Sequence, residues 1–251
     1  MLIFTSLSFT DACISASGKS SLLLSLLRLL EIQVGRIEVD GVDLRRLPRA
    51  LIRQRCFITI PQEAFLFPSA SIRFNLDPSG RLPDKALVSA LEMTGLWAIF
   101  RGAVSDGAVN ESPEPADHGD VFDKLLTSFP ELSVGQTQLF ALARALLHAR
   151  VASDVRGTEF ADYPVSQQPK PIVLMDEATS SLDPETESRM YDIIQEHFID
   201  TGHTVVMVTH KLGTFADRMR QGKDKIVWMR DGLIEGISNA ENLLGFSQSA
   251  S

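Results

Sequence analysis

Residues 17–30 read Ser-Gly-Lys-Ser-Ser-Leu-Leu-Leu-Ser-Leu-Leu-Arg-Leu-Leu. The part from Leu22 to Leu30 is apolar nearly all round, which predicts a helix buried beside a sheet. A Gly-Lys-Ser turn that opens such a helix can wrap phosphate groups, because backbone N–H groups and the positive helix end face the anion. That helix end disfavours a cation such as Lys19 unless an anion is bound there. The stretch therefore predicts a phosphate-binding loop, although the turn alone is weak evidence.

A second stretch supplies carboxylates. Four apolar residues, Ile172–Met175, precede Asp176 and Glu177. They predict a buried strand of a parallel sheet whose C-terminal edge presents both acidic side chains. Phosphoryl transfer needs one carboxylate at the metal ion and a second group that orients the attacking water. We therefore assign Asp176 to Mg²⁺ and Glu177 to the water, and the alternative is a pair of solvated carboxylates at a strand end.

Further elements follow from periodicity and from residues that break it. The Asp40-Gly41 pair between alternating residues predicts a β-hairpin at 36–42. Pro184, behind Asp183, predicts the start of a helix that runs to about Phe198. The remaining predicted strands are residues 56–60, 204–208 and 225–229, and the remaining predicted helices are 48–55, 85–100 and 137–149. The segments 105–123 and 151–170 are rich in polar residues and proline, which predicts surface loops.

Composition limits the function classes. The 251 residues are 44% hydrophobic, which is enough for a sizeable core, and 24 basic against 32 acidic residues give a net charge of −8. This balance predicts no nucleic-acid partner. The two cysteines form no zinc-like spacing, and no metal other than Mg²⁺ borne by a nucleotide is expected. The most apolar run is far shorter than the roughly 20 residues that a spanning helix needs, so we expect no membrane span in this chain.

A third stretch carries a family resemblance. Leu132-Ser133-Val134-Gly135-Gln136 resembles the signature sequence of the ATP-binding-cassette (ABC) ATPases. The resemblance covers about residues 17–246, so residues 1–251 are interpreted as one ABC ATPase domain. It implies a P-loop α/β fold with a mixed sheet, an antiparallel β subdomain and a helical subdomain at about 64–150 that includes the signature. Residues 151–170 would be an insertion loop.

The resemblance also implies roles for individual residues. ATP would contact the residues around the lysine, which are Ser17, Gly18, Lys19, Ser20 and Ser21. Mg²⁺ would be held by Ser20, Gln62 and Asp176. Catalysis would depend on Glu177, on His210 and on Gln62, which also signals to the transporter. The signature residues Ser133, Val134, Gly135 and Gln136 would face the ATP of a partner cassette, and Ser181 and Asp183 would belong to a loop that crosses to that partner.

Two of these assignments have a structural alternative that is compatible with the functional one. Ser133 and Asp183 each stand directly before a predicted helix, where both residue types commonly cap the free N–H groups. A capped helix N-terminus that faces a partner's γ-phosphate satisfies both interpretations. His210 ends an apolar strand, where a lone histidine is often structural, but its place after Asp176-Glu177 favours catalysis.

Finer details look like the multidrug-resistance-associated (C) subfamily of exporters. They are the segments Phe67–Pro78, Gly95–Trp97 and Gln138–Leu147. Within that subfamily the second cassette keeps the catalytic glutamate, so Glu177 points to the second cassette. The implied partners are another cassette, packed head to tail, and transmembrane domains that use ATP hydrolysis for export. The chain would then lie at the cytoplasmic face of a membrane, and otherwise in the cytoplasm.

The start of the chain departs from the family. A full phosphate loop has a glycine where this chain has Cys13, and the family usually has another at Ala16. Each change can cost about 1–3 kcal/mol if the loop needs a glycine conformation there. Asp11 also stands where a buried strand should feed the loop. We therefore expect residues 1–16 to be an atypical, N-terminally truncated start that impairs the ATPase.

Two alternatives to a transport ATPase remain at this point. The first is a cassette fragment that binds nucleotide poorly, hydrolyses nothing and acts as a binding or interaction module. The second is a soluble cassette protein of the translation or repair kind. The lack of a basic surface and the exporter-like segment Phe67–Pro78 disfavour the second alternative, whereas the lost glycines are compatible with the first.

Overall fold

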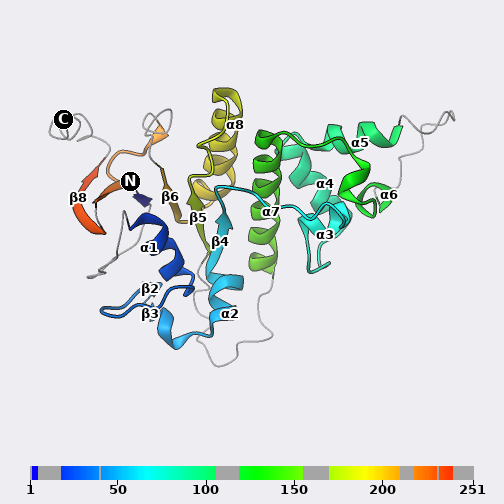
Figure 1. Ribbon diagram of the computed structural model, residues 1–251. Coiled ribbons are helices and arrows are strands. Elements are labelled where there is room, and N and C mark those ends of the chain that lie inside the picture. The colour runs from blue at the N-terminus through cyan, green and yellow to red at the C-terminus, as the bar shows by residue number, and fades with distance from the viewer. Residues whose placement is uncertain are drawn as a thin grey trace. The chain divides into compact units, whose positions relative to one another are not determined.

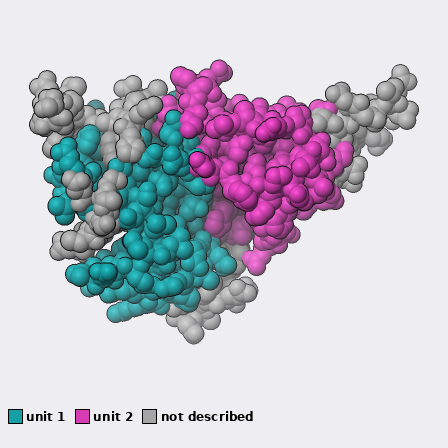
Figure 2. All heavy atoms as spheres, viewed as in Figure 1, with its two compact units in different colours: residues 1–62, 157–180, 195–251 teal, residues 63–156, 181–194 magenta. Residues whose placement is uncertain are grey.

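The computed structural model describes residues 2–4, 18–39, 41–105, 119–154, 170–209, 218–230 and 232–239. Predictions for Asp11, Cys13, Ala16, Ser17 and His210 therefore lie outside the described residues. The chain forms two compact units (Figure 2). Unit 1 comprises residues 1–62, 157–180 and 195–251, and unit 2 comprises residues 63–156 and 181–194.

Unit 1 is built on a six-stranded mixed sheet (Figure 1). Its order is β4-β5-β6-β1-β7-β8, and the bounds are β4 Phe57–Ile60, β5 Ile172–Asp176, β6 Val205–Val208, β1 Leu2–Phe4, β7 Lys225–Arg230 and β8 Leu233–Asn239. The strands β4, β5 and β6 are parallel, and the others pair antiparallel. All four residues of β6 and the apolar residues of β5 are buried, as expected of parallel strands covered on both faces. The predicted α/β fold with a mixed sheet is confirmed.

The strand β1 lies in the centre of the sheet but runs in an unexpected direction. It pairs antiparallel with β6, so that Leu2 lies opposite Val208 and Ile3 opposite Met207. A strand that fed a phosphate loop directly would run parallel to β6 and bring its carboxyl end to the edge where Asp176 lies. Here the amino-terminal residue of β1 is aligned with that edge. The sequence pattern predicted neither β1 nor β8.

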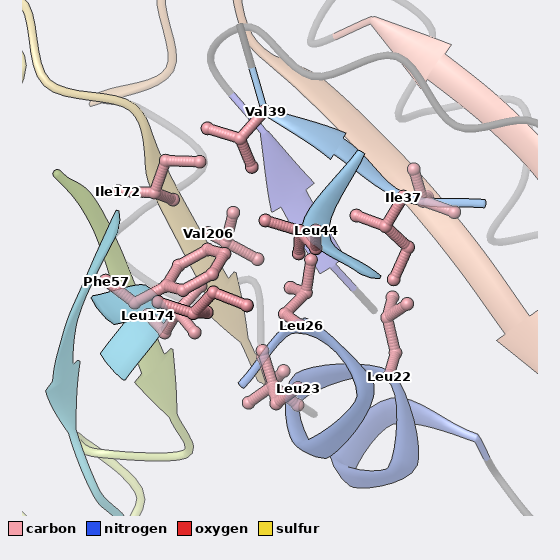
Figure 3. Close-up of a cluster of buried hydrophobic side chains, with 13 residues drawn as sticks. Leu22, Leu23, Leu26, Ile37, Val39, Leu44, Phe57, Ile172, Leu174 and Val206 are labelled. Atoms are coloured by element: carbon pink, nitrogen blue, oxygen red, sulfur yellow. The ribbon is translucent and has the colours of Figure 1, made fainter. Parts of the chain in front are cut away.

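Helix α1 (Lys19–Leu26) packs on this sheet through its leucines. Figure 3 shows Leu23 and Leu26 on the side of Leu174 and Val206 of the strands, and Leu22 pointing toward Ile37. All of these side chains are buried. At about 25 cal/mol for each Å² of apolar surface, a fully buried leucine contributes about 1.5–3 kcal/mol to folding. The predicted buried helix is confirmed for its first two turns.

The predicted extension of this helix to Leu30 is wrong. The helix ends at Leu26, and Arg28 adopts a left-handed backbone with φ of 50°. The Arg28 guanidinium donates hydrogen bonds to the carbonyl oxygens of Leu44 (3.3 Å) and Leu47 (3.1 Å). These contacts offset the cost of the backbone conformation, which is about 1–3 kcal/mol for a non-glycine residue. Leu29 and Leu30 are consequently exposed.

Between α1 and β4 the chain forms the predicted hairpin and a short helical segment. The hairpin consists of β2 (Glu38–Val39) and β3 (Val42–Asp43), which form a separate two-stranded sheet. It is followed by η1 (Leu44–Arg46), α2 (Arg49–Leu51) and the π-helical turn η2 (Ile52–Cys56). The predicted helix after Pro48 is therefore present, and it leads directly into β4.

Unit 2 is helical in its described residues. Its helices are α3 Ile72–Leu76, α4 Asp84–Met93, α5 Trp97–Ser105, α6 Gly119–Phe122, η3 Leu126–Ser128, α7 Val134–Asp154 and α8 Pro184–Ile194. Buried phenylalanines pack edge to face inside it, with ring centroids of Phe100 and Phe129 5.2 Å apart. After α8 the chain continues as the π-helical turn η4 (Gln195–Ile199), which belongs to unit 1.

Three predicted segments of this region differ from the structure. The predicted helix at 85–100 is divided into α4 and α5, because Gly95 adopts φ of 72° and ends the first helix. The predicted loop at 105–123 contains α6 near its end. Helix α7 reaches Asp154 and so extends into the predicted insertion loop.

One histidine of unit 1 is expected to make the free energy of unfolding depend on pH. His203 is only 9% exposed, and its Nδ1 lies 3.0 Å from the hydroxyl of Thr201. Burial, together with the nearby charge of Lys170, lowers the pKa of His203. The unfolded chain therefore binds this proton more readily than the folded one, and stability is lost as the pH falls below about 6.5.

We expect the free energy of unfolding of His203→Gln to fall less than that of the parent between pH 7.5 and pH 5.5. Urea unfolding at both pH values measures the difference. Equal losses of stability in the two proteins would show that His203 does not titrate in this way.

Candidate functional site

The carboxyl ends of β4, β5 and β6 bring three predicted site positions to one edge of the sheet. Ile60 is aligned with Met175, and Asp176 is aligned with Val208. Gln62 follows β4 by two residues, Glu177 directly follows β5, and Thr209 directly follows β6. His210 comes next but lies outside the described residues. In open α/β sheets ligands bind outside the carboxyl ends of the strands, so this edge is the candidate site.

The acidic pair at the end of β5 is electrostatically strained. Asp176 is half-buried, and its pKa is raised by burial and by the negative charge of the adjacent Glu177. Two carboxylates in this position repel each other unless a cation lies between them or a proton is bound. Carboxylate oxygens are also the ligands that Mg²⁺ prefers in proteins. The pair is therefore suited to hold a divalent cation.

Glu177 also has an unusual backbone conformation. Its φ is 46°, its N–H donates to the carbonyl oxygen of Val208 (3.0 Å), and its own carbonyl oxygen accepts from the N–H of Ser180 (3.0 Å). A glutamate in this left-handed conformation costs about 1–3 kcal/mol, and such residues occur preferentially at functional sites. The hydrogen bond to Val208 fixes the turn to β6, so the direction of the Glu177 side chain is set by the sheet.

The lysine predicted to bind phosphate lies at the start of α1. Gly18 precedes it with φ of 77°, a conformation that other residues adopt only at a cost, and Lys19 is the first helical residue. The Lys19 side chain is only 7% exposed. Within the part of the chain that the structure describes, the Lys19 ammonium makes no hydrogen bond and no ion pair. A buried cation at the positive end of a helix is unfavourable, and an anion bound there would remove that cost.

The other residues predicted for this site are placed as follows. Ser20 and Gln62 are exposed, and Ser21 is half-buried. The N–H of Leu22 donates to the carbonyl oxygen of Gly18 (2.9 Å), and this hydrogen bond forms the first turn of α1. The structure thus places Gly18, Lys19, Ser20, Gln62, Asp176 and Glu177 in unit 1.

The predicted signature residues begin helix α7 in unit 2. The N–H of Gln136 donates to the hydroxyl of Ser133 (3.2 Å), and the N–H of Ser133 donates to the side-chain oxygen of Gln136 (2.9 Å). This reciprocal pair is a capping box, which is worth about 1 kcal/mol to the helix. Val134 between them is exposed. The capping interpretation of Ser133 therefore applies.

The predicted crossing loop also ends in a cap. A side-chain oxygen of Asp183 accepts hydrogen bonds from the N–H groups of Glu185 (3.1 Å) and Thr186 (3.0 Å). Hydrogen bonds from the backbone and the side chain of Thr186 lower the pKa of Asp183. Ser181 is exposed just before this cap. Asp183 is thus the N-cap of α8, and its carboxylate stays charged at neutral pH.

The sequence patterns missed two polar residues that shape unit 2. Asn75 is buried, and its amide bonds the Phe67 backbone twice, accepting from the N–H (2.7 Å) and donating to the carbonyl oxygen (2.9 Å). Arg144 of α7 donates to the carbonyl oxygen of Phe65 (2.8 Å). The run from Phe67 to Pro78 entered the predictions only as a likeness to a subfamily. An asparagine that bonds nearby backbone groups was the available signal.

A comparison with known proteins identifies the family. The sequence profile of the family described as ABC transporter matches residues 14–151 of the chain. The chain belongs to the ABC transporter family. The predicted resemblance to the ABC family is thereby confirmed.

The chain is similar to a short part of much longer transporters. It is 33% identical over 237 residues to the ABC-type transporter FG02316 of Gibberella zeae, a match that covers 94% of this chain and 13% of that protein. It is 34% identical over 220 residues to the ABC multidrug transporter B of Aspergillus fumigatus, a match that covers 88% of this chain and 12% of that protein. It is 37% identical over 229 residues to the ATP-binding cassette sub-family C member 10 of Mus musculus, a match that covers 91% of this chain and 12% of that protein. The chain thus spans 12–13% of these relatives, and the predicted likeness to subfamily C is confirmed.

Two of these relatives are named as transporters, so we searched the helices of this chain for membrane-spanning segments. Among the residues that the structure describes, no helix is both long and apolar enough to cross a bilayer.

The strain in the acidic pair of this ABC domain is testable. Because burial and Glu177 raise the pKa of Asp176, the charged form destabilises the metal-free fold at neutral pH, and stability is regained as the pH falls through the raised pKa. We expect Asp176→Asn to raise the melting temperature of the metal-free chain at pH 7 and to lose most of the further rise that Mg²⁺ with ATP gives the parent.

Differential scanning fluorimetry with EDTA, and then with MgATP, measures both effects. Glu131→Gln, which neutralises an exposed carboxylate of unit 2, is the control. A metal-free Asp176→Asn chain that melts below the parent would contradict the interpretation of the acidic pair.

Proposed function

We propose that this chain binds ATP with Mg²⁺ and hydrolyses it as the nucleotide-binding domain of an ABC exporter. The observation that supports it most is the buried Lys19 at the N-terminus of α1, which lacks an anionic partner among the described residues. The half-buried Asp176 at the sheet edge, whose pKa is raised by burial and by Glu177, adds a carboxylate suited to a cation. An anion site and a cation site in the same unit are what a magnesium nucleotide requires.

In this proposal some residues bind the nucleotide and the metal ion, and others orient the attacking water. Gly18 turns the chain so that the N–H groups of the first turn of α1 and the Lys19 ammonium bind phosphate oxygens. The Ser20 hydroxyl, Gln62 and the Asp176 carboxylate would hold the metal ion. When bound, ATP supplies the transferred phosphoryl group and Mg²⁺ neutralises the charge that develops on it.

Glu177 orients the attacking water in this proposal, and Gln62 assists from the neighbouring strand end. The Glu177 carboxylate accepts a hydrogen bond from the water and directs its oxygen toward the terminal phosphorus atom. The hydrogen bond between Glu177 and Val208 keeps this carboxylate at the edge of the sheet. His210, two residues after Val208, is proposed to contact the γ-phosphate and to complete this group.

A second cassette is the proposed partner. Ser133, Val134, Gly135 and Gln136 at the start of α7, with Ser181 and Asp183 before α8, are proposed to face ATP bound to that cassette. The long helix α7 presents a positive end at the signature, which favours a phosphate group. Because each site needs residues from two cassettes, hydrolysis by a single chain is expected to be slow.

Membrane domains are the second proposed partner, and unit 2 offers a surface for them. Phe65, Phe67 and Phe74 are 65%, 48% and 44% exposed and pack edge to face, with ring centroids 4.9 and 5.7 Å apart. Arg144 and Asn75 hold the backbone of this aromatic group in place. Exposed aromatic groups commonly mark protein interfaces. We propose that the group receives a segment of the transmembrane part at the cytoplasmic face of the membrane, and that export follows.

The alternative function is a binding module without hydrolysis. One observation favours it: β1 runs antiparallel to β6, so no described strand leads directly into the phosphate loop. The sequence departures at Cys13 and Ala16 point the same way. This alternative shares ATP binding with the proposal but predicts no turnover at any protein concentration.

Turnover and its concentration dependence separate the two functions. We expect phosphate release by the purified chain to fall faster than linearly on dilution, because the active form contains two cassettes. We expect Glu177→Gln to keep ATP affinity within about threefold and to lower turnover at least about a hundredfold, since the amide no longer orients water.

The matched control is Glu196→Gln, an exposed glutamate of η4, which should leave both quantities unchanged. Turnover that is linear in protein concentration would contradict the two-cassette mechanism, and an unchanged rate in Glu177→Gln would remove Glu177 from it. No turnover in the parent at high concentration would favour the binding module.

A further inference from the structure

Gly135 at the start of α7 is enclosed by the loop and helix that follow Ser181. A Cβ atom added to Gly135 would lie 3.3 Å from the Cγ2 methyl of Thr186, 3.6 Å from its hydroxyl and 3.9 Å from a methyl of Leu182. The backbone of Gly135 has no left-handed φ. The space beside Gly135 is therefore tight for a larger residue, and a Cβ there would fit only if Thr186 moved by a few tenths of an ångström.

Thr186 connects two caps. Its backbone N–H donates to Asp183 (3.0 Å), and its side chain also hydrogen bonds to that carboxylate. Its methyl group, on the same side chain, occupies the space beside Gly135. On the other side of the contact, Gly135 lies between Ser133 and Gln136, whose reciprocal hydrogen bonds cap α7.

We propose that Thr186 is a positioning residue that locks the signature turn and the Asp183 loop into one body. The inference rests on the proposed function, in which both segments face the nucleotide of a partner cassette. Two caps that meet at one tight contact resist independent shifts, because a displacement of either cap toward the other would force Thr186 against the backbone of Gly135. A displacement of the signature turn then also displaces Asp183 and its loop, and a displacement of that loop displaces the signature turn.

The central test is Gly135→Ala, which forces a methyl group against Thr186. We expect the amide hydrogens of Glu185 and Thr186, which bond to Asp183, to exchange about fivefold faster, the factor for the loss of one cap. Thr186→Ser removes the methyl and keeps the hydroxyl. Gly135→Ala with Thr186→Ser should therefore return the exchange of both amides to the parent rate. Amide exchange measured by NMR on the nucleotide-free chain gives these rates.

The matched control is Gly102→Ala in α5, where an added Cβ would meet no atom within 4 Å. It should leave the exchange of Glu185 and Thr186 unchanged. If Gly135→Ala does not fold, Thr186→Ala tests the same contact from the other side. It should accelerate exchange of the Gln136 amide, which donates to Ser133, because coupling between two sites is reciprocal.

Two results would overturn the inference. One is Gly135→Ala with parent exchange rates at Glu185 and Thr186, and the other is acceleration that Thr186→Ser does not reverse. Since these measurements use no nucleotide, they are independent of the proposed ATPase function. A second readout links the two: where the parent hydrolyses ATP, Gly135→Ala should lower kcat more than it raises KM, and Thr186→Ser should restore kcat. Restored exchange without restored kcat would contradict the role of the contact in positioning.

Discussion

The burial of the α1 leucines against the parallel strands is the constraint on which the candidate site depends. Leu22, Leu23 and Leu26 lie in one apolar cluster with β5 and β6. This packing fixes the start of the helix and holds Lys19 at its positive end in a position that is almost entirely buried. The favourable burial of three leucines is large enough to offset an unfavourable lysine. The packing of the leucines thus keeps Lys19 at the start of α1.

The second unit follows a different principle, in which polar side chains hold backbone groups. Ser133 with Gln136 caps α7, Asp183 caps α8, and Asn75 bonds the backbone of Phe67. Each of these bonds satisfies a backbone group that would otherwise have no partner at a helix end or a bend. Residues that resemble partner-facing motifs therefore also stabilise the helices on which they lie. A structural role and a functional role coexist at the same positions.

Local chemistry made much of this structure predictable from the sequence. The apolar runs of β5 and β6, the Asp-Gly hairpin and the capping types of Ser133 and Asp183 each reflect preferences of a few neighbouring residues. The end of α1 was not predictable, because the left-handed Arg28 depends on carbonyl groups of the later residues Leu44 and Leu47. Likewise, the direction of β1 depends on pairing with β6 and β7, and the tight space beside Gly135 depends on Thr186. These misses share one cause, which is contact between segments that are distant in the sequence.

Titrating the chain with MgATP beside Lys19→Met, which keeps the size of the side chain but removes its charge, tests the role of Lys19 most directly. We predict that Lys19→Met binds ATP at least about tenfold more weakly, as expected for the loss of a charge-assisted hydrogen bond. We also expect the variant to melt at a higher temperature than the parent without nucleotide, because it lacks a buried cation that has no anionic partner among the described residues. The control is Lys85→Met, an exposed lysine in the first turn of α4, which should change neither quantity. Equal ATP affinities in the parent and Lys19→Met would contradict the claim that this lysine forms the phosphate site.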